Sequence, residues 1–171
     1  MNLFKIGKLV NTHGIKGEVR IISDFKFKDE VFKKGNNLII GKFKETKKIM
    51  TYRVHKDFDM VTFDGINDIN DVLDYKGFDV YIDRDEYTFS GILYEDLIGL
   101  EVYCNDLLIG NVIEVMKNHA HPILVILKGD TKNMVPFIDE FIKNVSLESK
   151  RIDIKVIEGL LHENWYSKFI S

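Results

Sequence analysis

Short stretches of alternating apolar and polar residues, separated by turn-forming residues, recur along the whole chain. An alternation with a period of two predicts β-strands with one buried face. A strand about every 8–12 residues is typical of β-sandwiches and β-barrels. In the first half of the chain the predicted strands cover residues 4–10, 18–21, 37–44, 47–56, 60–63 and 78–82.

Two segments between these strands follow other patterns. Residues 13–17, His-Gly-Ile-Lys-Gly, predict a glycine-containing turn that joins the first two strands into a hairpin. In residues 67–75, Ile69, Val72 and Leu73 recur at helical spacing. We expect one short helix there, capped by Asn67 or Asp68 and ended before Gly77.

Residues 83–91 show no clear period and predict a seam between two domains. We expect a first domain over residues 1–83, a linker over 84–92 and a second domain over 93–171. Domains this small bury a core without open edges most easily as closed barrels, so the fold class is mostly β with two small barrels. Strands of the second domain are predicted at residues 100–104, 108–117, 122–128, 133–136 and 151–156, with Gly110 as a bulge or close-approach point.

Composition supports a folded, strand-rich protein. Ala occurs once, whereas Ile and Val together occur 36 times, which favours strands over helices. The longest aliphatic run, Ile123–Leu127, is too short to span a bilayer, and the N-terminus lacks a secretory pattern. The single cysteine, Cys104, cannot form an internal disulfide, so we expect a cytoplasmic protein without a membrane segment.

Charge is unevenly distributed along the chain. Residues 1–56 contain 14 Lys and Arg against 5 Asp and Glu, a net charge of +9. Residues 57–85 carry 2 against 9, and residues 86–171 carry 8 against 13, so their net charges are −7 and −5. This segregation predicts that the N-terminal part meets a polyanion. A solvated basic face is the alternative.

The sequence offers no recognisable catalytic constellation. Neither a phosphate-cradling P-loop nor a Gly-x-Ser-x-Gly elbow occurs, and Cys104 has no evident partner. His119 and His121 could face one side of an extended segment, but no Cys, Asp or Glu stands in the same loop to complete a metal site. We therefore expect a protein that is not an enzyme and that needs no metal or cofactor.

Two segments suggest binding surfaces. At the hairpin tip, the cations His13, Lys16 and Arg20 stand beside two glycines, where backbone and side chains can approach phosphate closely. The alternative is an ordinary hairpin turn, which also collects Gly and Lys.

The second candidate surface follows the predicted linker. Leu93, Tyr94 and Leu97 are large apolar residues in the segment Leu93–Leu100, next to two acidic residues. A surplus of apolar side chains there would form a partner-binding patch, and Tyr is favoured in such patches. The alternative is that these side chains belong to the core.

Several ordered motifs together give a family resemblance. In the first domain Ile6–Val10 is followed by His13–Arg20; in the second, the motifs are Asp96–Val102, Ile109–Val112, Val135–Phe137 and Glu158–Leu161. With these motifs the chain resembles the RimM family of ribosome maturation factors over nearly its whole length.

The resemblance implies an N-terminal six-stranded barrel like those of translation factors and a C-terminal PRC-barrel. It also implies a non-catalytic factor that binds the free small ribosomal subunit, assists maturation of the head region of its rRNA and contacts small-subunit ribosomal protein nineteen. The family's partner-binding motif has two successive tyrosines, where this chain has Leu93 and Tyr94. We expect a monomer. A PRC-barrel interaction module outside ribosome assembly is the alternative, and an RNA-processing enzyme is a third reading.

Overall fold

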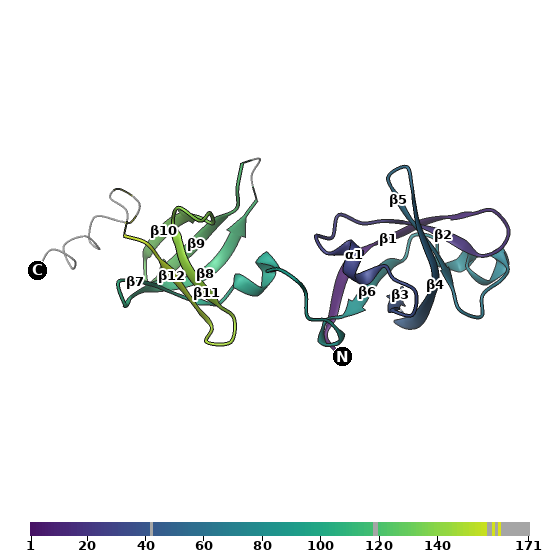
Figure 1. The fold of residues 1–171 in the computed structure, drawn as a ribbon, viewed down its shortest axis with the longest axis horizontal. Coiled ribbons are helices and arrows are strands. Elements are labelled where there is room, and N and C mark those ends of the chain that lie inside the picture. The colour runs from purple at the N-terminus through teal and green to yellow at the C-terminus, as the bar shows by residue number, and fades with distance from the viewer. Residues whose placement is uncertain (42, 118–119, 157–158, 160, 162–171) are drawn as a thin grey trace, which may run out of the picture. The chain divides into compact units, whose positions relative to one another are not determined.

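The computed structural model describes residues 1–41, 43–117, 120–156, 159 and 161. The chain divides into two compact units, residues 1–91 and residues 92–171, each built mainly of strands (Figure 1). Over the part that is described, no helix is long and apolar enough to cross a membrane.

The first unit is a six-stranded antiparallel barrel. Its strands follow the order β1-β2-β5-β4-β3-β6, and β6 pairs with β1 to close the ring. This confirms the expected six-stranded N-terminal barrel. The strands are β1 (Leu3–His13), β2 (Glu18–Ile22), β3 (Asn37–Ile40), β4 (Glu45–His55), β5 (Phe58–Phe63) and β6 (Asp79–Asp83).

Alternation along the strands sorts side chains between the core and the outer surface. In β2, Val19 and Ile21 are fully buried, whereas Glu18 and Arg20, which alternate with them in sequence, are only half-buried. Because successive strand residues point to opposite faces, the buried pair places Arg20 on the outer face. The predicted hairpin of β1 and β2 is therefore confirmed, with its polar side chains outside the barrel.

The predicted helix over residues 67–75 is wrong in type. The segment forms two single 3₁₀ turns, η1 (Ile69–Asp71) and η2 (Leu73–Tyr75), interrupted at Val72 with φ of −122°. Ile, Val, Asn and Asp are weak helix formers, so local propensity does not carry an α-helix here. The predicted Asp68 cap is present, since its Oδ1 accepts from the backbone N of Asn70 at 2.8 Å. The structure also contains a short helix, α1 (Lys28–Val31), that the pattern did not predict.

Residues 84–91 pack on the first unit. They begin with the 3₁₀ turn η3 (Arg84–Glu86), and the ring of Phe89 then stacks on those of Tyr87 and Phe27, with centroids 5.5 and 5.1 Å away. The hydroxyl of Ser90 donates to Glu30 at 2.8 Å. The exact domain boundaries proposed from the sequence stay a prediction.

The second unit is a six-stranded sheet that encloses its own core. Its strand order is β10-β9-β8-β7-β12-β11, and only the β7–β12 pair among these neighbours is parallel. Val135 of β10 and Val145 of β11, from opposite ends of the sheet, pack against one hydrophobic cluster, so the sheet curls around it. The elements are η4 (Tyr94–Leu97), β7 (Glu101–Cys104), β8 (Leu107–Met116), β9 (Ile123–Lys128), β10 (Thr131–Pro136), β11 (Ile142–Ser146) and β12 (Arg151–Ile154).

Two details of this sheet bear on the sequence pattern. β11 was not predicted, because its register shifts between Ile142 and Asn144 and the apolar Ile142 and Val145 then stand three residues apart. The prediction for Gly110 is confirmed: its φ is +143°, and a Cβ there would lie 2.5 Å from the carbonyl oxygen of Leu127.

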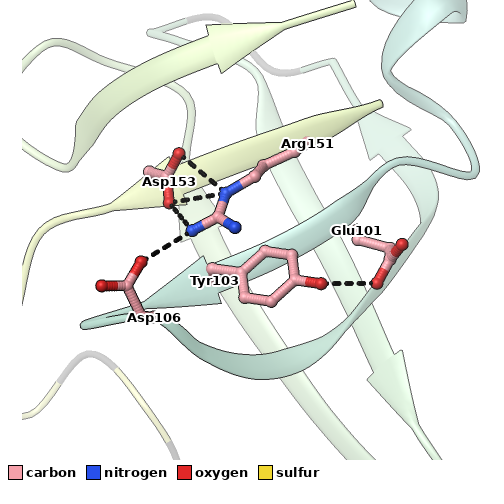
Figure 2. Close-up of polar contacts among 5 residues, drawn as sticks. All are labelled: Glu101, Tyr103, Asp106, Arg151 and Asp153. Carbon is pink, nitrogen blue, oxygen red and sulfur yellow. Dashed lines mark hydrogen bonds and ion pairs between the residues drawn. The ribbon is translucent and has the colours of Figure 1, made fainter. Parts of the chain in front are cut away.

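An arginine on β12 ties together the neighbouring strand and its turn (Figure 2). The guanidinium of Arg151 donates to Asp153 at 2.7 Å and to Asp106 at 2.9 Å, and it lies 3.8 Å from the centroid of the Tyr103 ring. The Tyr103 hydroxyl donates to Glu101 at 2.8 Å, and this bond raises the pKa of the phenol. All these contacts stay within the second unit, so we assign the group a structural role on the β7–β12 pair.

Candidate RNA-binding hairpin and partner surface

The tip of the β1–β2 hairpin is held in place by the rest of the first unit. His13 pairs with Glu18 across the turn, and Gly14 and Gly17 take positive φ values of +69° and +92°. The backbone N of Ile69 donates to the carbonyl oxygen of Ile15 at 2.9 Å. A hydrogen bond from outside β1 and β2 therefore also holds the tip in place.

The three cations predicted at this tip divide into a pair and a separate residue. A nitrogen of the Arg20 guanidinium lies 2.7 Å from Nδ1 of His13. Because guanidinium only donates hydrogen bonds, His13 accepts through Nδ1. Lys16 is exposed in the turn itself. The structure thus brings His13 and Arg20 together and places Lys16 beyond them at the tip.

The structure adds two side chains that the sequence pattern did not bring to this hairpin, an imidazole and a guanidinium. The ring of His55, at the end of β4, lies with its centroid 5.8 Å from that of His13. Arg53 of the same strand makes a bidentate pair with Glu18, at 2.7 and 3.0 Å. Their sequence signal was the polar face of the predicted strand over residues 47–56, but only the strand order β2-β5-β4 brings that face close to the hairpin. Together His13, Lys16, Arg20, Arg53 and His55 form what we call the hairpin cluster.

Glu18 is the carboxylate inside this cluster. The bidentate hydrogen bond from Arg53 lowers its pKa, as do the charge of Arg53 and the nearby imidazoles of His13 and His55, while burial opposes the shift. Glu18 is therefore ionised at neutral pH and offsets the charge of Arg53.

The charge of the first unit needs a correction. The net charge of +9 over residues 1–56 does not describe the barrel as a whole, because the acidic stretch of residues 57–85 belongs to the same unit. Residues 1–91 contain 16 Lys and Arg against 15 Asp and Glu, a net charge of +1. Attraction to a polyanion must then come from local groups such as the hairpin cluster.

The predicted partner-binding residues of the second unit differ in exposure. Leu93 and Leu97 are only 4% and 0% exposed, and they are core residues. Tyr94, on η4, is half-buried, with its ring edge-on to Phe137 at 6.0 Å between centroids. Of the three, Tyr94 alone keeps an appreciable surface. A partner-binding role for this segment stays a prediction, and the burial limits direct contact mainly to Tyr94.

Cys104, His119 and His121 are the remaining residues that the sequence analysis considered for nucleophilic or metal chemistry. Cys104 is buried in the second core, and this burial raises the pKa of its thiol, which weakens it as a nucleophile. His119 lies outside the described residues, so the predicted His119–His121 pair is not described by the structure. In the described ranges, no three His, Cys, Asp or Glu side chains gather where they could hold a metal.

Comparison with known proteins supplies the family. The RimM N-terminal domain matches residues 4–87 and the RimM PRC barrel domain matches residues 94–160. Ribosome maturation factor RimM of Streptococcus mutans is 40% identical over an alignment of 172 positions, which covers 96% of this chain and 100% of the relative. The protein of the same name from Staphylococcus haemolyticus is 40% identical over an alignment of 164 positions, which covers 92% of this chain and 98% of the relative.

Among solved structures, a 16S ribosomal RNA processing protein RimM from Pseudomonas aeruginosa is 19% identical and has a TM-score of 0.45. The match covers 91% of this chain and 98% of that one. The sequence matches decide the question, since both domains are found in order and the curated relatives are matched over nearly their full length. The resemblance is confirmed, and the chain belongs to the RimM family of ribosome maturation factors.

Proposed function

We propose that this protein is a non-catalytic assembly factor that binds the free small ribosomal subunit in the cytoplasm. In this proposal the hairpin cluster contacts rRNA of the head region, and the surface around Tyr94 contacts small-subunit ribosomal protein nineteen. The protein acts as a monomer, without a cofactor and without a small-molecule substrate.

The hairpin cluster is the observation that carries the RNA-binding part. Lys and Arg side chains attract phosphate, and a cluster on a fastened hairpin offers them in a defined arrangement. The imidazoles of His13 and His55 add polar groups beside these cations. Membership of a family of ribosome maturation factors supports rRNA as the polyanion.

Such a factor needs no catalytic group to promote maturation. If the protein binds one rRNA conformation more tightly than its competitors, it increases the population of that conformation by the ratio of the two affinities. The requirement is a surface that distinguishes conformations, which a closed barrel with a hairpin tip held in place can provide.

The charge of the second unit supports a basic protein partner. Residues 92–171 contain 8 Lys and Arg against 12 Asp and Glu, a net charge of −4. Ribosomal proteins that bind rRNA carry positive charge, so long-range attraction would favour the encounter. Apolar contact at Tyr94 would then hold the complex.

Co-sedimentation of the full chain with free small subunits, assembled ribosomes and an unrelated RNA of similar length tests this function. We expect recovery with free small subunits and little with the other two. Equal recovery with all three would reject an assembly role. Recovery with none would favour the alternative, a PRC-barrel interaction module that works outside ribosome assembly.

A further inference from the structure

We propose that Ile15, at the tip of the β1–β2 hairpin, makes an apolar contact with an unpaired base of the bound RNA. The inference rests on the proposed function, because it assumes that the hairpin faces RNA. It adds a second component to binding: the hairpin cluster holds phosphates through charge, and Ile15 contributes a contact that salt does not screen.

The exposure of Ile15 is the first observation. Its side chain is 77% exposed, although every other feature of the turn is polar or glycine. Turns in such hairpins favour Gly, Asn, Asp and Ser, for conformational and hydrogen-bonding reasons. The turns at Asn105-Asp106 and Gly129-Asp130 follow that preference, whereas the turns before β4 and β12 also hold exposed apolar residues, Phe43 and Leu147. Ile15 differs from these two in standing beside the His13–Arg20 pair, on a turn that a hydrogen bond from Ile69 holds in place. An isoleucine at this position serves neither the turn nor the core.

The fastening of the tip is the second observation. The carbonyl oxygen of Ile15 accepts from Ile69, and a Cβ at Gly17 would lie only 3.0 Å from Ile66, so the turn packs closely on the segment behind it. The backbone of Ile15 is therefore held while its side chain points away from the unit's core. Because the tip is already ordered, little conformational entropy is lost when it binds.

The charges around Ile15 indicate the partner. Lys16 follows it directly, and His13 with its Arg20 partner stands at the base of the same turn. Cations that flank an apolar side chain match a nucleotide, which presents an apolar base face beside a charged phosphate. Isoleucine is among the apolar residues that insert between bases in other nucleic-acid complexes. A basic protein surface would instead be repelled by these cations.

Only RNA with accessible base faces fits this arrangement. In a continuous A-form helix the bases are stacked and the major groove is too narrow for side-chain access. Loops, bulges and strand ends leave base faces open. The expected ligand is therefore an RNA with an unpaired or easily unstacked nucleotide, next to phosphates that Lys16 and Arg20 can reach.

The test measures binding of the full chain to two RNA probes by fluorescence anisotropy, at 50, 100 and 200 mM KCl. One probe is a hairpin with a single-nucleotide bulge and an eight-nucleotide loop, and the other is a fully paired duplex of matching stem sequence. The variants are Ile15→Ser, Ile15→Phe and Lys16→Ala. We expect Ile15→Ser to lose about tenfold in affinity for the hairpin at every salt concentration, so that its log–log salt slope stays parallel to the wild type.

The other variants give the expected contrasts. Ile15→Phe keeps or increases affinity, because an aromatic ring stacks on a base. Lys16→Ala lowers the salt slope by roughly 1, which marks a lost phosphate contact. Leu73→Ser is the matched control, since Leu73 is a 49% exposed apolar residue on an acidic turn of the same unit. That control should bind both probes as the wild type does.

Several outcomes would overturn the proposal. If Ile15→Ser binds the hairpin RNA probe normally while Lys16→Ala lowers the salt slope, the β1–β2 hairpin binds RNA but Ile15 does not contact a base. If neither variant changes RNA binding, the assignment of the hairpin to RNA in the proposed function fails as well. A loss shown equally by the paired duplex, or a melting temperature lowered as far as for a buried residue, would also reject a base contact. So would weaker binding to small subunits with unchanged RNA affinity, since the tip would then contact protein.

Discussion

The sequence predicts binding surfaces at the tip of the first hairpin and at the segment Leu93–Leu97. In the structure, the two differ in the exposure of their apolar side chains. At the tip, Ile15 and Lys16 are exposed. In the second segment Leu93 and Leu97 are buried, and only Tyr94 keeps part of its surface. The first segment points away from its core, and the second helps to build its core.

The difference shows how a small domain uses its apolar residues. A domain of this size buries only about 60% of the surface of its unfolded chain, so most large apolar side chains are needed inside. An apolar cluster is therefore weak support for a binding surface when neighbouring strands have an apolar face that the cluster can cover. An isolated apolar residue between glycines and cations, such as the exposed Ile15, is stronger support, because its side chain is not part of the core.

The largest expected effect tests the buried segment. Replacing Leu97 with Ala removes a fully buried side chain and leaves a cavity, so the second unit should lose about 2–5 kcal/mol of unfolding free energy. Urea denaturation of the full chain, followed by circular dichroism, measures this loss. Ile98→Ala, at a neighbouring residue that is 51% exposed, is the control and should cost about 0.5 kcal/mol or less. Equal stabilities for the two variants would contradict the core assignment of Leu97.

A smaller effect is expected at Tyr94, and on binding. Tyr94→Ala should weaken binding to ribosomal protein nineteen by about 2 kcal/mol, because a half-buried aromatic at an interface is a typical anchor. The loss should be nearly the same at 50 and 300 mM salt, since an apolar contact is not screened. Isothermal titration calorimetry at both salt concentrations measures it.

Tyr94→Phe separates the ring of Tyr94 from its hydroxyl. The phenylalanine keeps the edge-on packing against Phe137, so affinity should stay close to that of the wild type. A folded Tyr94→Ala variant with normal affinity would remove Tyr94 from the interface and leave this segment with a core role alone.

At the hairpin, the expected effects appear in salt dependence. Arg20→Ala and Lys16→Ala should each weaken binding to free small subunits and reduce the log–log salt slope by roughly 1, as each phosphate contact is lost. Binding measured across a salt series tests this. Lys132→Ala, at an exposed lysine on β10 of the other unit, is the control for a general change in charge. The assignment fails if all three variants shift the slope alike.

The smallest expected effect is the pH dependence of Glu18→Gln. The hydrogen bond from Arg53 holds the folded-state pKa of Glu18 below the ordinary value of 4.5, so the ionised form stabilises the fold above that pH. This contribution is lost as pH falls through the lowered pKa. The melting temperature of Glu18→Gln should therefore lie slightly below that of the wild type at pH 7, and the gap should close as pH falls through the lowered pKa of Glu18.

The control for this pH effect is another carboxylate of the first unit. Asp57→Asn removes an exposed charge in the β4–β5 turn without breaking the bidentate pair, and it should leave the pH profile close to the wild type. A melting-temperature gap for Glu18→Gln that widens toward acid pH would show that the ionised Glu18–Arg53 pair does not stabilise the fold.

Period-two alternation predicted most strands of both units, because a strand with one buried face imposes that pattern directly. It failed where the backbone departs from regular pairing. β11 has a register shift, and α1 is only four residues long, so neither leaves a clear period. The segment at residues 67–75 has helical spacing but not helical propensity, and packing of the buried Val72 is compatible with two 3₁₀ turns.

For the candidate site, the sequence alone determined the local part: a glycine-pinned turn with His13, Lys16 and Arg20 on it, and a family resemblance carried by ordered motifs. Only the tertiary structure brought Arg53 and His55 to that turn, because strand order joins β2 to β4 through β5 across more than 30 residues of chain. The same holds for burial. Whether an apolar side chain such as Ile15 or Leu97 meets water or a core depends on which strands close around it, and local sequence does not encode those long-range pairings by itself.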